Sequence, residues 1–274
     1  MIKLSKRLAA IADMVPQGSR LVDVGCDHAH IDIALLQEGR IPHALAMDVA
    51  DGPLAIARQN ISLVGLDGQC EVRKSNGLSA YRKGEGDVLV IAGIGGILIQ
   101  SILSDAPEKA ESFRELILSP HREPWVLRSY LTANGMGICE ERFIEDDGKF
   151  YPILRVIPGG ESVHPDWDQC ILRLLQMSDE ELSQAHVRRE TVLELLRDCA
   201  FRSSAEAVYG PCLIRSNDKI LFNFVAQSLK AKLAVYNKLN EASERSTAAD
   251  RRRVEMLSEI GMMQTLLFMH EFLL

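Results

Sequence analysis

The segment LVDVGCDHAHI, residues 21–31, determines the architecture expected of this chain. Its apolar, β-branched start is followed by a glycine at Gly25 and then by the apolar run IDIALLQ. This order predicts a buried strand, a tight turn and the start of a helix. Because glycine has no Cβ, a ligand can approach the backbone closely at Gly25, and the helix N-terminus adds unpaired N–H donors. The carboxylates of Asp23 and Asp27 flank this turn.

The same alternation of strands and helices continues to about residue 158, which predicts βαβ units around a parallel sheet, and hence an α/β fold. The expected strands are residues 20–24, 43–47, 70–74, 87–92, 115–118, 137–144 and 150–156. Asp147-Gly148 lies between the last two strands and is a strong hairpin signal. We therefore expect one antiparallel strand at or near an edge of the sheet.

The composition changes at Pro158-Gly159-Gly160, so we expect two domains, residues 1–158 and 159–274. The second domain is predicted to be all helical, with helices at about 168–175, 178–196, 218–242 and 250–272 and a polar turn near Ser246. Apolar residues spaced three and four apart predict that the last two helices form an antiparallel hairpin with a coiled-coil-like seam. The expected seam residues are Phe222, Val225, Leu229, Leu233, Tyr236 and Asn240, opposite Val254, Leu257, Gly261, Gln264 and Phe268. Such a hairpin could serve packing alone or grip a partner.

Bulk properties exclude several classes of protein. No apolar run approaches the roughly 18 residues of a membrane span. The six cysteines are scattered without a C-x-x-C pair, which argues against a disulfide framework or a zinc site and favours a reduced cytoplasm. The histidines show no metal-ligand spacing, so no metal is expected. A net charge of −7 argues against gross attraction to nucleic acid, although it leaves room for a local basic patch.

Four successive loops carry ligand-binding chemistry at the carboxyl ends of expected strands, where ligands bind in open parallel sheets. They are residues 25–28, 48–49, 75–77 and 93–96. The candidate ligand contacts in and beside them are Asp23, Gly25, Asp27, His28, Asp48, Val49, Asn76, Gly77, Ala92, Gly93 and Gly95.

Two cofactors are candidates for these loops. A dinucleotide site requires G-x-G-x-x-G, but Asp27 occupies the place of the second glycine and would repel a pyrophosphate. S-adenosylmethionine carries no phosphate, and its ammonium suits Asp23 or Asp27. Asp48 can accept both ribose hydroxyls, and Asn76 can bond the adenine amine. The alternative, purely structural role for Asp27 is to cap the helix that follows it. The set as a whole favours S-adenosylmethionine.

Several motifs together resemble those of the bacterial tRNA adenine(22)-N1 methyltransferases, the TrmK family. They are LSKRL (residues 4–8), DVGCDHA (23–29), DGP (51–53), NGL (76–78), IAGIGG (91–96), LRSYLTANG (127–135), DDGKFY (146–151) and YGPCL (209–213). Two departures are Asp48, where the family often has Glu, and Ser119-Pro120-His121-Arg122, where it often has a Gln-Pro-Asn-like sequence. The second departure lies on the presumed substrate side.

The resemblance implies a Rossmann-like class I methyltransferase domain with a mostly parallel seven-stranded sheet, followed by a helical, coiled-coil-like domain. It also implies methyl transfer from S-adenosylmethionine to N1 of an adenine in tRNA. Adenine N1 attacks through its lone pair and needs no base, so we expect positioning and a nearby negative group to matter most. Asp27 is the candidate catalytic carboxylate, although pairing with the cofactor is the competing role.

Contacts with tRNA phosphates are expected from Lys6, Arg7, Arg122 and Arg128, each of which could instead belong to a solvated face. Two other functions remain open. One keeps the cofactor but methylates another RNA, a protein or a small molecule. The other is a non-catalytic module that binds the adenosyl cofactor or RNA. The oligomeric state is left open.

Overall fold

The computed structural model describes residues 2–241 and 247–274. The chain divides into two compact units, the first ending at Val163 and the second running from His164 to Leu274. The predicted turn near Ser246 lies outside the described residues.

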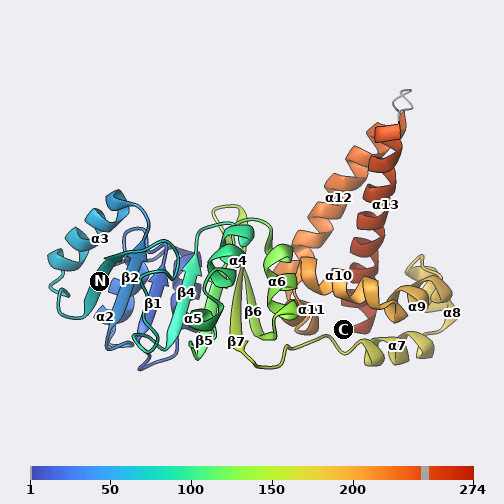
Figure 1. Ribbon diagram of the computed structural model, residues 1–274. Helices are drawn as coiled ribbons and strands as arrows, with labels where there is room; N and C mark the ends of the chain where they lie inside the picture. The colour runs from blue at the N-terminus through green and yellow to red at the C-terminus, as the bar shows by residue number, and fades with distance from the viewer. Residues whose placement is uncertain (1, 242–246) are drawn as a thin grey trace. The chain divides into compact units, whose positions relative to one another are not determined.

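The first unit is built on one seven-stranded sheet with the order β3-β2-β1-β4-β5-β7-β6 (Figure 1). The strands are β1 (Leu21–Val24), β2 (Ala44–Asp48), β3 (Cys70–Lys74), β4 (Val88–Ala92), β5 (Glu115–Ser119), β6 (Met136–Asp146) and β7 (Lys149–Pro158). Strands β1 to β5 are parallel, whereas β7 runs antiparallel to both β5 and β6. The expected mostly parallel sheet with one antiparallel strand near an edge is confirmed.

The strand order reverses direction at β1, which pairs with β2 on one side and β4 on the other. All four residues of β1 are buried, as are Val88 to Ile91 of β4, which is typical of central parallel strands covered on both faces. Burial of each such aliphatic side chain contributes about 1.5–3 kcal/mol. The carboxyl ends of β1, β2 and β4 therefore meet at a rigid, apolar-backed edge, where ligands bind in this class of sheet.

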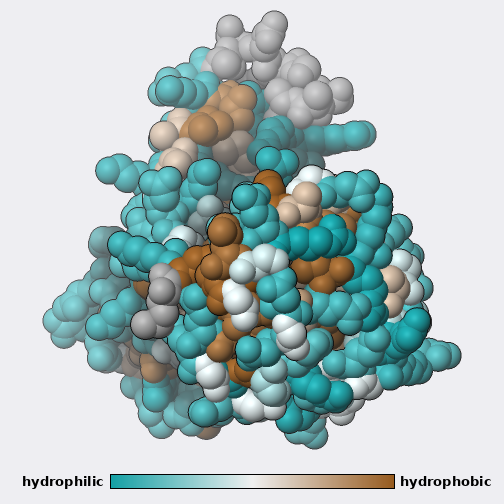
Figure 2. All heavy atoms as spheres, turned by 90° about the vertical axis from the view of Figure 1, so that its left-hand side faces the viewer, coloured by the Kyte–Doolittle hydropathy of each residue, from teal (hydrophilic) through white to brown (hydrophobic). Residues whose placement is uncertain are grey.

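Six helices accompany this sheet: α1 (Lys6–Met14), α2 (His30–Gln37), α3 (Asp51–Leu63), α4 (Gly96–Ser104), α5 (Pro107–Ala110) and α6 (Pro124–Ala133). Helix α3 packs on β2 and β3, α1 packs on α2, and α4 packs on α6. Helix α5 has a single turn, too short for a periodic signal in the sequence. On the side of the molecule that carries α3, hydrophilic side chains predominate and hydrophobic ones gather in smaller patches (Figure 2).

The hairpin between β6 and β7 forms where Asp147-Gly148 predicted it. Asp147 has φ +51° and Gly148 has φ +69°, so both central residues are left-handed, as a type I′ turn requires. This turn lies beside α1, because the backbone N–H of Arg7 donates to Oδ2 of Asp146 at 3.0 Å. The hairpin thus fixes the N-terminal helix at the edge of the sheet where the strands end.

The second unit is helical. Its elements are α7 (Trp167–Gln176), α8 (Asp179–Gln184), α9 (Arg189–Arg197), α10 (Cys199–Tyr209), α11 (Pro211–Arg215), α12 (Lys219–Glu241), α13 (Thr247–Phe268) and a π-helical turn, Met269–Leu273. The single helix predicted over 178–196 is wrong: it begins at a Ser178–Glu181 capping box but breaks after α8, where His186 adopts φ +56°. No glycine or proline marks this break in the sequence.

Helices α12 and α13 pack against each other, with Phe222 and Val225 buried on α12. The seam predicted for α13 agrees with the structure at Phe268, which is buried, but is in the wrong phase in the first half of the helix. Met256, Ile260 and Met263 are buried there, whereas Val254 and Leu257 are exposed. These three residues form an apolar stripe at i, i+4 and i+7, and periodicity alone did not distinguish this stripe from its neighbour.

Candidate functional site

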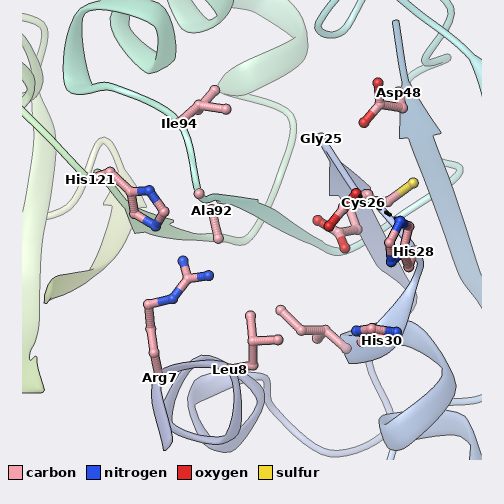
Figure 3. Close-up of a pocket in the computed structure, with 14 residues that line it drawn as sticks. Arg7, Leu8, Gly25, Cys26, His28, His30, Asp48, Ala92, Ile94 and His121 are labelled. Atoms are coloured by element: carbon pink, nitrogen blue, oxygen red, sulfur yellow. Dashed lines mark ion pairs between the residues drawn. The ribbon is translucent and has the colours of Figure 1, made fainter. Parts of the chain in front are cut away.

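A pocket of about 350 Å³, here called the main pocket, lies at the carboxyl ends of β1, β2 and β4 (Figure 3). It brings together eight of the residues predicted from the sequence: Arg7, Asp23, Gly25, Asp27, His28, Asp48, Ala92 and Gly93. Leu8, Cys26, His30, Ile31, Ile94 and His121 complete its lining. The predicted loops therefore converge on one site, although not every predicted residue reaches it.

The turn after β1 has an unusual backbone. Gly25, Asp27 and Ala29 all adopt left-handed conformations, with φ of +76°, +51° and +58°. The N–H groups of Gly25 and Cys26 donate to the Met47 carbonyl at 2.8 and 3.1 Å, which ties the turn to β2. Left-handed non-glycine residues cost of order 1–3 kcal/mol each and cluster at functional sites. The strain here shapes the floor of the main pocket.

Asp27 does not cap the following helix. Helix α2 begins at His30, its N-cap is Ala29, and no side chain caps it. The Asp27 carboxylate is 72% exposed and lies 3.4 Å from Nε2 of His28. It remains accessible to a ligand at the mouth of the main pocket.

Asp23 and Asp32 form a buried carboxyl pair beneath the main pocket. Asp32, from the first turn of α2, is fully buried, and neither of its oxygens accepts a hydrogen bond from an N–H or hydroxyl donor among the described residues. Burial raises the pKa of Asp32 to about 6 and raises that of Asp23 well above its ordinary value, with further contributions from Asp32, Asp48 and Asp27. The two carboxyls are electrostatically coupled, and a proton on one of them removes the repulsion between two buried negative charges. Asp32 was not among the site residues predicted from the sequence. A charged residue within the largely apolar run IDIALLQ was the feature that could have indicated it.

Asp48 ends β2 and is held by its own loop. Its Oδ1 accepts the backbone N–H of Ala50 at 2.9 Å. Val49, Asn76 and Gly77 also lie at strand ends, but they do not line the main pocket. Val49 and Asn76 are exposed beside it. Only Asp48 of this group faces the enclosed volume.

Arg7 points from α1 into the main pocket instead of lying on an outer face (Figure 3). Its Nη1 is buried and has no hydrogen-bond partner in the described part of the chain, and burial lowers the pKa of the guanidinium. An unpaired guanidinium nitrogen is costly to bury, so this position fits an anionic ligand group. Its neighbour Lys6 is exposed and donates to the Glu145 carbonyl at 3.1 Å.

Arg128 is buried, whereas the predicted contact with tRNA phosphates requires it at the surface. Its side chain is 3% exposed and its Nε lies 2.7 Å from Oε1 of Glu141, so both charges are buried in an ion pair between α6 and β6. Arg122, in contrast, is exposed. The sequence pattern does not distinguish the buried Arg128 from the exposed Arg122, because both are single arginines close to or within an amphipathic helix.

His121 was not among the predicted site residues. It follows β5, another strand that ends at the same edge of the sheet. This position after a strand end is the feature of the sequence that could have indicated it as a site residue. Its ring packs against Tyr151 at 5.1 Å between centroids. Burial and the nearby charges of Arg7, Lys149 and Arg122 lower the pKa of His121, so the imidazole is neutral at pH 7.

The sheet order, with one antiparallel β7 and a ligand pocket after β1, defines a class I methyltransferase fold. Residues 4–154 match the family described as methyltransferase domain, and the chain belongs to that family. Among the described residues, no helix is long and apolar enough to cross a membrane, and no group of three acidic, histidine or cysteine side chains is placed to hold a metal.

The chain is similar to the tRNA (adenine(22)-N(1))-methyltransferase of Bacillus subtilis, with 27% identity over 261 residues and 94% of each chain covered. It also resembles the structure of a candidate tRNA (m1A22) methyltransferase of Streptococcus pneumoniae in complex with S-adenosyl-L-methionine, with 27% identity, a TM-score of 0.72, and 97% and 100% of the two chains covered. A Listeria monocytogenes structure matches with 26% identity, a TM-score of 0.78 and the same coverage. The family resemblance predicted from the sequence is confirmed.

Proposed function

We propose that this protein transfers a methyl group from S-adenosylmethionine to N1 of adenine 22 in tRNA. The observation that carries the proposal is the match to the Bacillus subtilis enzyme along 94% of both chains, which includes the helical part as well as the methyltransferase domain. The related Streptococcus pneumoniae structure contains the cofactor. The main pocket supplies groups that suit it.

The charges lining the main pocket fit S-adenosylmethionine better than a dinucleotide. Asp48 is the acceptor for the ribose hydroxyls, and Asp23 and Asp27 suit the ammonium of the methionine end. The unpaired Nη1 of Arg7 suits the methionine carboxylate, so we reassign Arg7 from tRNA to the cofactor. The backbones at Gly25, Ala92 and Gly93 and the side chain of His28 complete the enclosed contacts. Val49, Asn76, Gly77 and Gly95 belong to the proposed outer contacts.

When bound, the cofactor supplies an electrophilic methyl group on a sulfonium. Adenine N1 needs only its lone pair to accept this group, so the protein need not remove a proton. The protein contributes position and electrostatics, worth several kcal/mol when the reacting atoms are held in contact. Asp27 stays the sequence-based candidate for a carboxylate near the developing cation. Asp27→Asn should then lower turnover far more than cofactor affinity, and an equal loss of both would assign Asp27 to cofactor binding alone.

For tRNA, we propose that Lys6 and Arg122 contact phosphates, since both are exposed, Lys6 next to Arg7 of the main pocket in α1 and Arg122 next to His121. Reversing the Lys6 charge should weaken tRNA binding and reduce its salt dependence by about one ion. The proposed domain division has the catalytic part in residues 1–158 and a helical part in 159–274. The helical part serves either as a packing element or as a tRNA-binding element. A cytoplasmic location belongs to the same proposal.

Transfer of labelled methyl from S-adenosylmethionine to unmodified tRNA, followed by nucleoside mass analysis, tests this function. The expected product is 1-methyladenosine. Label in another nucleoside, or in protein or small molecules only, would establish a different acceptor. Calorimetric binding of S-adenosylhomocysteine without any transfer would instead favour a non-catalytic module.

A further inference from the structure

A second cavity, here called the acceptor groove, adjoins the main pocket. It measures about 610 Å³ and shares Gly93, Ile94 and His121 with the main pocket. Its other lining residues are Gly95, Ile97, Leu98, Ser101, Arg122 and Glu123. Because these three residues line both cavities, a group bound in the groove lies next to the contents of the main pocket.

The groove is built from two loops locked together at the ends of β4 and β5. The N–H of Gly93 donates to the Ser119 carbonyl, that of His121 to the Ile94 carbonyl at 2.9 Å, and that of Gly96 to the Arg122 carbonyl at 2.8 Å. A Cβ at Gly96 would lie 2.3 Å from the Glu123 carbonyl oxygen, so only glycine permits this close approach. The shape of the groove is therefore fixed by the backbone.

One wall of the acceptor groove is apolar and exposed. Ile97 and Leu98, at the start of α4, are 56% and 51% exposed. Two large aliphatic side chains side by side on a helix surface cost free energy unless something covers them. A flat, aromatic ligand that stacks on this wall would cover it, and a nucleobase is such a ligand.

Glu123 also lines the groove and has an unusual backbone conformation. Glu123 adopts φ +48°, a conformation that glutamate rarely takes, and it directly precedes α6. Its carboxylate accepts no hydrogen bond and makes no ion pair within the described residues, and Oε2 lies against Gly95. A half-buried carboxylate without a partner is suited to a cation or to a group that becomes cationic.

We propose that the acceptor groove receives the target adenine and that Glu123 faces the positive charge that develops on its ring. The proposal rests on the proposed function. In the transfer, the N1 lone pair forms the new bond to the methyl carbon, the carbon–sulfur bond breaks, and its electron pair stays on sulfur. The positive charge thereby moves from sulfur to the adenine ring, and no proton is transferred.

Electrostatics support this assignment over Asp27 alone. A fixed carboxylate beside the ring stabilises the transition state more than the neutral adenine, which is the requirement for catalysis. His121 lies where the two cavities meet, and as a neutral imidazole it adds no repulsion to the cationic product. The competing role for Glu123 is structural, because its carboxylate also lies near the N-terminus of α4, where negative charge is favourable.

Glu123→Gln separates the two roles, with the exposed Glu111→Gln as the matched control on the same unit. We expect Glu123→Gln to lower the single-turnover rate of tRNA methylation by about 10- to 100-fold. Its affinity for S-adenosylhomocysteine should stay within about twofold of wild type, since Glu123 does not line the main pocket. Glu123→Asp should recover part of the rate, and Glu111→Gln should match wild type in both.

A Glu123→Gln rate equal to wild type would overturn the proposal. A lower rate accompanied by an equal loss of S-adenosylhomocysteine affinity would also overturn it. So would a lower rate accompanied by a lowered melting temperature that Glu123→Asp does not restore. Leu98→Asp gives a second test of the occupant. It should raise the KM for tRNA while leaving S-adenosylhomocysteine affinity unchanged, and an unchanged KM would exclude the groove as the acceptor site. Wild-type protein that methylates no tRNA would instead refute the proposed function itself.

Discussion

The guanidinium of Arg7 lies over the ring of Tyr151, with 5.1 Å between its central carbon and the ring centroid. This contact joins α1 to β7, two elements more than 100 residues apart in the sequence. The aromatic face holds the cation without using its N–H donors, which leaves Nη1 free to bind a ligand in the main pocket. The N-terminal helix is thus part of the site.

Arg7→Gln should weaken S-adenosylhomocysteine binding. A hydrogen bond to a charged group contributes about 1.5–3 kcal/mol, which corresponds to roughly a 10- to 100-fold rise in Kd. Calorimetry measures the Kd for S-adenosylhomocysteine directly. Lys6→Gln is the control, because it removes the same charge one residue away on the exposed side of α1. Equal effects of the two changes would show that Arg7 acts only through long-range charge.

Gly25→Ala should lower cofactor affinity beyond the cost of its backbone strain. Gly25 and Gly39 both have positive φ, +76° and +63°, and no atom lies within 4 Å of an added Cβ at either position. Each alanine should therefore destabilise the fold by about 1 kcal/mol, measured by urea unfolding. Only Gly25 lines the main pocket, so Gly39→Ala should bind S-adenosylhomocysteine normally. Normal binding by both variants would remove Gly25 from the site.

Asp32→Asn should change how stability depends on pH. The pKa of Asp32 is raised to about 6 in the fold, so the native state holds a proton that the unfolded chain releases near pH 4. The contribution of Asp32 to wild-type stability therefore falls as the pH rises from about 4 to about 6, by up to about 3 kcal/mol. Removing the carboxyl should lessen this fall.

Urea unfolding at pH 4, 5, 6 and 7 measures the effect of Asp32→Asn. The advantage of the variant over wild type should grow with pH across this window. The exposed Asp105→Asn variant serves as the control and should follow wild type. A constant difference between Asp32→Asn and wild type at every pH would contradict the raised pKa of Asp32.

Arg128→Met should destabilise the first unit by about 3–5 kcal/mol, because it leaves Glu141 charged and buried. Adding Glu141→Leu should recover most of this loss in chemical denaturation. The folded fraction of the double variant should bind tRNA as wild type does. Weaker tRNA binding by a fully folded double variant would restore Arg128 to the interface.

Local sequence patterns predicted the elements of the sheet well. Strand 70–74 agrees with the structure at both ends, and Asp147-Gly148 forms the predicted hairpin. These features depend on hydrophobic runs and turn residues that are close in sequence. The break at His186 and the phase of α13 depend on which neighbour covers which face, so they could not be predicted from spacing.

The site was predictable where it follows strand ends, as at Gly25, Asp27 and Asp48. It was not predictable where side-chain direction decides the role. Both Arg7 and Arg128 were predicted to be exposed arginines. Arg7 instead points into the main pocket, and Arg128 pairs with Glu141 in the core. Glu123 carried no sequence signal at all, because its position depends on the contact between two loops, 93–96 and 119–123.

The most direct test of the central claim is methyl transfer to a defined tRNA transcript that carries adenine at position 22, compared with the same transcript carrying guanine there. Single-turnover assays with labelled S-adenosylmethionine and nucleoside mapping give the position of the methyl group. We predict one 1-methyladenosine per transcript, at position 22, and no transfer to the guanine-22 transcript. Equal labelling of both transcripts, or 1-methyladenosine at another position, would contradict the account.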